Sequence, residues 1–159
     1  MGVDAQPGCG GGGMNNTWTP RIVVFQCQYS LYCEADQKWM DTQLPQHIKL
    51  IKVPCTGRIS PLFVLNAIQG GADGILVSGC LPEQCHFKEG NLGARRQLDE
   101  FRRFLSYLGM EEERMRFAWI DLSERGRIRQ ELADLEETIR AVGPAKRLVV
   151  RAIPVGEQP

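Results

Sequence analysis

The chain has 159 residues, 43% of them hydrophobic and 24% charged, which is the length of one ordinary domain and a composition that excludes a largely disordered chain. Lys plus Arg and Asp plus Glu each number 19, so the formal net charge is zero. A zero net charge argues against binding of nucleic acid or an anionic membrane through the overall field of the protein. The unusual feature is the presence of six cysteines.

The cellular compartment of the protein determines which roles these cysteines can have. Residues 1–20 are rich in Gly, Asn and Pro and lack the basic and apolar segments of a secretory signal. We expect them to form a flexible leader in which Cys9 has no role. No run of about 18 apolar residues occurs, so we expect no membrane span. A cytoplasmic location is predicted, where clustered cysteines bind metal or catalyse more often than they form disulfides.

From residue 21 onward, segments with the patterns of strands and helices alternate. The β-branched run at 22–25 predicts a strand that ends at Cys27, and a helix is expected over 34–44. A second strand is expected at 48–53. Ser60 and the proline that follows it have the pattern of a helix start, and this helix is expected to run through residue 68.

The second half of the chain continues the alternation. A third strand is expected at 74–78, then a helix with apolar residues at spacings of 3, 4 and 3 that ends at Gly109. A fourth strand at 115–120 and a helix over 128–142 follow, and residues 148–150 form either a fifth strand or a docking tail.

This alternation predicts an α/β fold with a small, doubly wound parallel sheet, as in flavodoxin. We assign residues 1–20 to the leader, 21–143 to the α/β domain and 144–159 to a C-terminal extension.

Three of the predicted strands end at or just before a cysteine, namely Cys27, Cys55 and Cys80. The carboxyl ends of parallel strands share one edge of a sheet, and neighbouring strands lie about 4.8 Å apart. The three thiols are therefore expected to converge. Cys33 at the start of the first helix and Cys85 in the loop after the third strand can reach the same edge.

Glycines accompany two of these cysteines. Gly57 follows in Cys-Thr-Gly, and Gly79 precedes in Ser-Gly-Cys. Glycine lets backbone amides approach a sulfur and donate hydrogen bonds to it. Arg58 is either a solvated side chain or a cation that offsets the charge of a cluster and raises its reduction potential.

The spacing of the cysteines leaves several roles open. A zinc site of four cysteines usually contains C-x₂-C pairs, and this chain has none. The C-x₄-C spacing of Cys80 and Cys85 has a counterpart in plant-type [2Fe–2S] proteins. A thiol–disulfide catalyst is disfavoured because C-x-x-C is absent. Iron–sulfur binding, zinc binding, a redox dithiol and simple core packing all remain possible at this point.

His86 directly follows Cys85 and could complete a mixed ligand set. A Rieske-type site needs two histidines, however, and His47 precedes the second strand at the opposite end of the sheet. We therefore expect His86 beside the cluster or on the surface. The sequence has no G-x-G-x-x-G after a strand and no Walker motif, which argues against independent nucleotide binding.

Several segments together resemble a known family: Phe25-x-Cys27, Val53-Pro-Cys-Thr-Gly-Arg58, Gly71-Ala-Asp-Gly74 leading to Ser78-Gly-Cys80, Cys85-His86 and Gly90-Asn-Leu92. Over roughly residues 21–142 the chain resembles the delta, iron–sulfur subunit of methyl-viologen-reducing (F420-non-reducing) hydrogenase.

The resemblance implies a [2Fe–2S] electron-transfer subunit of anaerobic metabolism with no catalytic residue of its own. It would relay single electrons to the flavin subunit of a heterodisulfide-reductase-like, electron-bifurcating complex. Its other partner would be a hydrogenase, or an enzyme of the formate dehydrogenase, methylenetetrahydrofolate reductase or benzoyl-CoA reductase type. The alternative is a zinc-stabilised assembly module without a redox role.

The chain departs from the family pattern after its first cysteine. Members typically carry a second cysteine three residues after the one that matches Cys27, and this chain has Ser30 there. We hypothesise that Cys33, one helical turn further, replaces the missing ligand. We expect iron to be bound by four of five candidates: Cys27, Cys33, Cys55, Cys80 and Cys85. Of these, Cys27, Cys55 and Cys80 are the most secure.

Overall fold

The computed structural model describes residues 18–30, 33–121 and 123–146. In these residues a parallel four-stranded sheet has the order β2-β1-β3-β4. The strand order reverses between β1 and β3, so the predicted doubly wound fold is confirmed. The possible strand at 148–150 lies outside the described residues, as do Cys9 and most of the predicted leader. The strands are β1 (Ile22–Cys27), β2 (Ile48–Val53), β3 (Gly74–Gly79) and β4 (Met115–Trp119).

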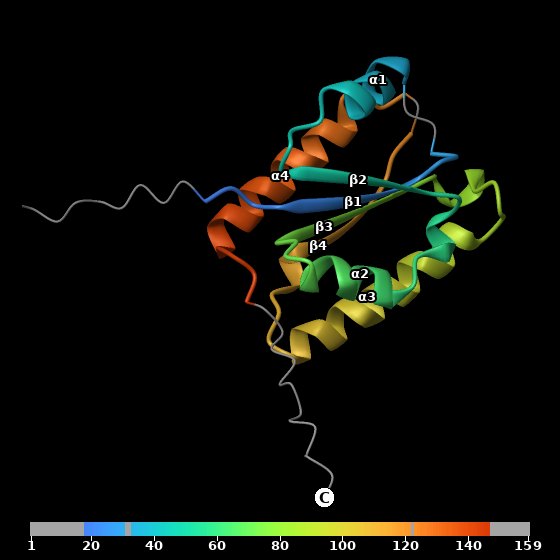
Figure 1. Ribbon diagram of the computed structural model, residues 1–159. Coiled ribbons are helices and arrows are strands. Elements are labelled where there is room, and N and C mark those ends of the chain that lie inside the picture. Colours follow the sequence, from blue (N-terminus) through green and yellow to red (C-terminus); the bar gives the residue numbers. More distant parts are fainter. Residues whose placement is uncertain (1–17, 31–32, 122, 147–159) are drawn as a thin grey trace, which may run out of the picture.

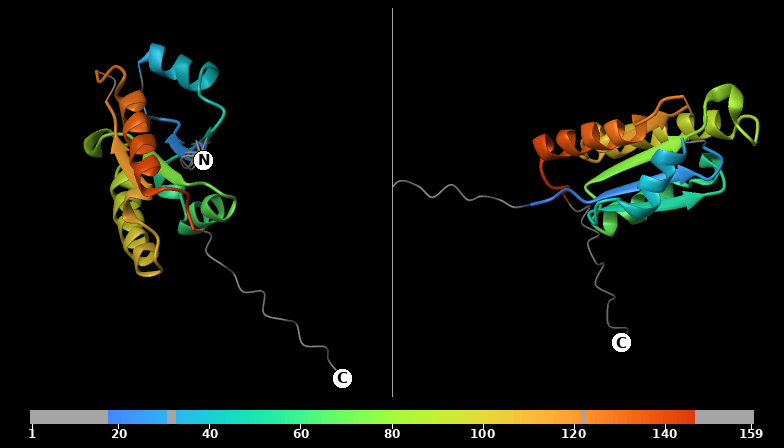
Figure 2. Two further views of the ribbon diagram at one scale, coloured as in Figure 1. Left: turned by 90° about the vertical axis from the view of Figure 1, so that its left-hand side faces the viewer. Right: turned by 90° about the horizontal axis from the view of Figure 1, so that it is seen from above.

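Two helices cover each face of the sheet (Figure 1), and the side and top views in Figure 2 show the same layers. Alternate residues of one strand enter the two cores, as the pleat requires. Val23 and Phe25 pack in the core beneath α2 and α3, whereas Ile22 and Val24 pack in the core beneath α1 and α4. The helices are α1 (Glu34–Thr42), α2 (Pro61–Gln69), α3 (Gly90–Tyr107) and α4 (Arg127–Val142).

The start of α2 agrees with the sequence, because the Ser60 hydroxyl accepts a hydrogen bond from the backbone N–H of Leu62 at 3.3 Å. Three short 3₁₀ helices were not expected from the sequence: η1 (Thr56–Arg58), η2 (Pro82–Gln84) and η3 (Glu112–Arg114). None of the helices in the described residues is both long and apolar enough to cross a membrane.

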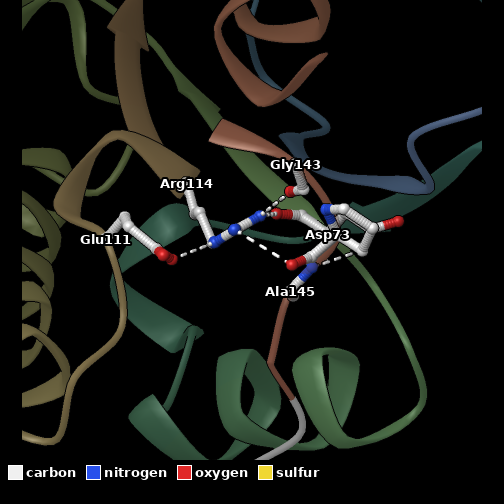
Figure 3. A network of polar contacts seen from close by, with 6 residues as sticks. Asp73, Glu111, Arg114, Gly143 and Ala145 are labelled. Carbon is white, nitrogen blue, oxygen red and sulfur yellow. Dashed lines mark hydrogen bonds and ion pairs between the residues drawn. The ribbon is translucent and has the colours of Figure 1, made fainter. Parts of the chain in front are cut away.

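A buried arginine organises the edge of the sheet where the strands begin (Figure 3). Arg114 is 2% exposed and pairs with the Glu111 carboxylate at 2.6 Å. Its guanidinium also donates to the carbonyl oxygens of Asp73 at 3.2 Å, Gly143 at 2.9 Å and Pro144 at 3.3 Å. One cation thus joins η3, the start of β3 and the end of α4.

The Asp73 carboxylate binds the backbone just before β1 and just after α4. It accepts hydrogen bonds from the backbone N–H groups of Arg21 and Ala145, each at 2.9 Å. The first residues of the segment that we assigned to a C-terminal extension are therefore hydrogen-bonded to the body of the domain.

Candidate metal centre

Four cysteines lie at the edge of the sheet where the strands end, on the right-hand side of Figure 1. Cys27 is the last residue of β1, Cys55 follows β2 by two residues, and Cys80 directly follows β3. These three side chains are buried. Cys85 follows η2 and is half-buried. Because the order of the strands reverses between β1 and β3, Cys27 and Cys80 flank the switch point where α/β sheets bind ligands.

The thiols of these cysteines are neighbours. Cys80 is hydrogen-bonded to both Cys27 and Cys85. Cys55 is hydrogen-bonded to Cys85 and is close enough to Cys27 for their charges to interact. These interactions link all four sulfurs, which we call the thiol ring (Cys27, Cys55, Cys80 and Cys85).

The protein environment separates the acidities of the ring thiols. Burial raises the pKa of Cys80 to about 12, and the neighbouring thiols of Cys27 and Cys85 add to this effect. Burial also raises the pKa of Cys55, opposed by a hydrogen bond that the backbone N–H of Gly57 donates to its sulfur at 3.4 Å. Burial thus disfavours the thiolate forms of Cys55 and Cys80.

The pKa of Cys85 is shifted in the opposite direction, below its ordinary value. Burial raises its pKa, but backbone N–H groups of Asn91, Phe87 and Gly90 donate to its sulfur, as does the Cys80 thiol, and together they leave the pKa below its ordinary value. The start of α3 thus provides preorganised donors for a negative charge on this sulfur.

Two glycines let η1 and the start of α3 approach each other. A Cβ atom on Gly57 would lie 2.9 Å from the carbonyl oxygen of Gly90. A Cβ atom on Gly90 would lie 2.6 Å from the sulfur of Cys55 and 3.8 Å from that of Cys85. Only a residue without a side chain fits between these two ring members.

Asn91 holds the loop after β3 in place. Its side chain is fully buried, and Nδ2 donates to the carbonyl oxygens of Cys80 at 2.8 Å and Leu81 at 2.7 Å. Gly90 and Asn91 contributed to the family resemblance, but the sequence assigned them no role. Their role depends on contacts with the β2 and β3 loops, which no local pattern encodes.

The surface beside the ring is hollowed and aromatic. A cavity of about 530 Å³ is lined by Pro54, Cys55, Gly57, Arg58, Phe87 and Gly90. His86 is exposed and stacks on Tyr29 with ring centres 3.9 Å apart, and Phe87 contacts both rings edge-on. The structure thus places His86 in a surface stack that joins the loop after Cys27 to the loop of Cys85.

Two hydroxyl groups near this edge are buried and have no hydrogen-bond partner in the described residues. They belong to Thr56, which is 0% exposed, and Ser30, which is 4% exposed. Thr56 follows Cys55, and its Oγ1 would lie 3.4 Å from a Cβ atom on Gly79, the residue before Cys80. No pattern in the sequence singled out Thr56.

Cys33 makes different contacts from the ring thiols. It precedes α1, and its thiol donates to the Asp36 carboxylate at 3.2 Å. That carboxylate also accepts from the backbone N–H of Gly126 at 2.7 Å and pairs with Arg129 at 3.2 Å. Cys33 is not among the main groups that set the pKa values of Cys55, Cys80 and Cys85.

The comparison with known families agrees with this geometry. A family model described as "Methyl-viologen-reducing hydrogenase, delta subunit" matches residues 22–143, which include the whole thiol ring. The chain belongs to this delta-subunit family. The resemblance inferred from the sequence is confirmed.

Similar proteins extend the finding. The iron-sulfur subunit of the F420-non-reducing hydrogenase of Archaeoglobus profundus is 38% identical over 134 residues, which cover 84% of this chain and 98% of the relative. The iron-sulfur subunit of the F420-non-reducing hydrogenase vhc of Methanococcus voltae is 38% identical over 132 residues, covering 82% of this chain and 92% of the relative. A subunit of the ferredoxin:CoB-CoM heterodisulfide reductase of Methanosarcina mazei is 34% identical over 126 residues, covering 79% of this chain but 16% of that relative.

The thiol ring of this delta-subunit family member fits an iron–sulfur cluster in its donor chemistry, because such clusters are held by cysteine thiolates and tuned by hydrogen bonds to sulfur. Within residues 18–30, 33–121 and 123–146, no three His, Cys, Asp or Glu side chains are arranged so that they could hold a metal ion. Binding would therefore require the thiols to lose protons and to shift their positions.

The pKa values predict an order of reactivity for the thiols of the metal-free protein. Because the thiolate is the nucleophile, Cys85 should be alkylated by iodoacetamide before Cys80 at pH 7–8. The rate at Cys80 should still be rising with pH after that at Cys85 has levelled off. Peptide mass spectrometry over a pH series measures both rates. Equal rates in the folded protein would contradict the prediction, and the urea-unfolded chain is the control in which they should converge.

Proposed function

We propose that this chain is an electron-transfer subunit that holds a [2Fe–2S] cluster on the sulfurs of Cys27, Cys55, Cys80 and Cys85. The observation that carries the proposal is the thiol ring at the carboxyl edge of the sheet, within the segment that matches the delta-subunit family. When bound, such a cluster accepts and releases one electron. The chain's own residues supply the sulfur ligands, exclude water and set the electrostatic surroundings.

Hydrogen bonds to sulfur favour the reduced, more negative state of such a group. Gly57 supplies one N–H to Cys55, and the start of α3 and the residues just before it supply three to Cys85. Gly79 lets Phe117 and Thr56 approach the end of β3, because a Cβ atom there would lie 3.3 Å from each. Arg58 contributes a positive charge at the rim of the cavity that Cys55 borders. We assign His86 to the aromatic surface above the ring, outside the ligand set.

The relatives support a place between two enzymes. Two of them are named as iron-sulfur subunits of F420-non-reducing hydrogenase, and the third belongs to a heterodisulfide reductase and contains a similar segment within a longer chain. We propose that this protein passes electrons, in the cytoplasm, to the flavin subunit of a heterodisulfide-reductase-like, electron-bifurcating complex. The partner on the other side is a hydrogenase, or an enzyme of the formate dehydrogenase, methylenetetrahydrofolate reductase or benzoyl-CoA reductase type.

Anaerobic purification tests the cofactor directly. We expect a brown protein with iron and acid-labile sulfide at about two of each per chain, as a [2Fe–2S] cluster contains. Its visible absorption should be bleached by dithionite. A colourless protein that contains zinc would instead support the zinc-stabilised assembly module. Four irons per chain would retain the relay but correct the cluster type.

A matched pair of variants tests the ligand set. Cys55→Ser should lose most of the bound iron, because it removes a soft sulfur ligand from the ring. Cys33→Ser should keep the wild-type iron content and spectrum, because a hydroxyl can still donate to Asp36. Loss of iron in Cys33→Ser would contradict our ligand set and support the hypothesis that Cys33 replaces a missing ligand.

A further inference from the structure

Thr56 has a buried hydroxyl group beside residues that adjoin two of the ring cysteines in the chain. It is the first residue of η1 and directly follows Cys55. On its other side, its Cγ2 and Oγ1 would lie 3.3 Å and 3.4 Å from a Cβ atom on Gly79, the residue before Cys80. The side chain therefore lies where the loops after β2 and β3 meet.

The Thr56 hydroxyl has lost its contact with water without gaining a partner in the protein. The residue is 0% exposed, and Oγ1 has no hydrogen-bond partner in the described part of the chain. Burial of an unpaired hydroxyl is unfavourable, and buried polar groups are nearly always hydrogen-bonded. Valine has almost the same shape and would avoid the cost, so the unpaired donor indicates an acceptor that the protein alone does not provide.

The acceptors that this position favours are sulfurs, because Thr56 directly follows Cys55 and its side chain adjoins Gly79, the residue before Cys80. We propose that Thr56 Oγ1 donates a hydrogen bond to a sulfur of the bound iron–sulfur group and thereby raises its reduction potential. This inference rests on the proposed function. The physical reason is that reduction adds negative charge, and a hydrogen bond to a more negative sulfur is stronger.

Thr56→Val tests the proposal, with Thr56→Ser as the variant that keeps the hydroxyl. The control is Thr138→Val on α4, which removes a hydroxyl that donates to the Asp134 carbonyl at 2.7 Å, away from the ring. Three quantities are measured for each protein: iron per chain, the midpoint potential from a titration followed by electron paramagnetic resonance, and the melting temperature of the metal-free form.

We expect Thr56→Val to bind iron with a midpoint potential lower by about 59 mV, which is a tenfold change for a one-electron couple. The melting temperature of the metal-free form should be unchanged or higher, because the unpaired hydroxyl is gone. Thr56→Ser and Thr138→Val should keep the wild-type potential. A Thr56→Val protein that folds but binds no iron, while Thr56→Ser binds it fully, would also support the hydrogen bond.

An unchanged potential in iron-loaded Thr56→Val would overturn the inference and leave the proposed function intact. A lower melting temperature of the metal-free variant would also overturn it, because the hydroxyl would then have a partner within the protein. If the wild-type protein itself bound no iron, the proposed function would fail before Thr56 was tested. The failures of the two proposals are thus distinguishable.

Discussion

Replacement of Gly90 by alanine is expected to abolish most iron binding. The new Cβ atom would lie 2.6 Å from the sulfur of Cys55, far inside van der Waals contact, so the sulfur or the start of α3 must move. Gly90 also donates its backbone N–H to Cys85, so a shift of the helix start disturbs a second ring thiol. Overpacking of this kind costs about 1–3 kcal/mol. We expect the variant to fold but to hold the ring sulfurs in positions that no longer bind iron.

The same helix provides the matched control. Gly93 lies one turn further along α3, and a Cβ atom there would meet no other atom within 4 Å. Gly93→Ala should retain full iron and gain up to about 1 kcal/mol from the better helix propensity of alanine. Iron and sulfide analysis, together with the visible spectrum, compares the two variants. Full iron content in Gly90→Ala would contradict the geometry of the ring.

Arg114→Met is expected to cause the largest loss of stability, about 3 kcal/mol or more. Methionine fills much of the space but leaves the carbonyl oxygens of Asp73, Gly143 and Pro144 without their donor. Chemical denaturation of the metal-free protein measures the effect. Arg116→Met is the control, because Arg116 is 31% exposed and its 3.5 Å pair with Glu131 is worth less than about 1 kcal/mol.

The stabilising effect of Arg114 should also depend on pH. Its guanidinium holds the pKa of Glu111 below its ordinary value, so the contribution of this pair is fully present above that ordinary pKa. It is lost as the pH falls through the lowered value of the folded state. The difference in stability between wild type and Arg114→Met should therefore shrink on acidification. A difference that grows below about pH 4, the ordinary range for a glutamate, would contradict this assignment.

Arg114→Met should nevertheless bind iron wherever it remains folded, because Arg114 lies at the edge where the strands begin. Gly90→Ala has the opposite profile, with a modest loss of stability and a large loss of iron. The two variants thus separate the residues that hold the domain together from those that shape the ring.

The fold could be predicted because its signals are local. The bounds of β2 agree with the predicted strand at 48–53, since a short run that contains Ile48, Ile51 and Val53 and is followed by Pro54 leaves few alternatives. The parallel sheet then brought Cys27, Cys55 and Cys80 to one edge with no further information. Those positions follow from topology, which the alternation of strands and helices encodes.

The finer structure of the site could not be predicted, because it depends on contacts between loops. Cys33 and Cys85 were both expected to reach the edge, and helical spacing favoured a role for Cys33. The thiol of Cys33 instead bonds to Asp36, whose carboxylate is held from α4 and its N-cap by Arg129 and Gly126. A partner about 90 residues away in the chain gives no signal within a local pattern.

The attachment of Arg21 and Ala145 to Asp73 has a consequence for how this domain can be combined with others. The backbone N–H groups of Arg21 and Ala145 bind the two oxygens of one carboxylate, so the backbone just before β1 and the backbone just after α4 meet at a single point. That point is at the opposite edge of the sheet from the thiol ring. Genetic fusion before Trp18, whose side chain packs against the core beneath α1 and α4, or after residue 145 is therefore expected to leave the sulfurs untouched. A similar segment does occupy 16% of a much longer chain in Methanosarcina mazei.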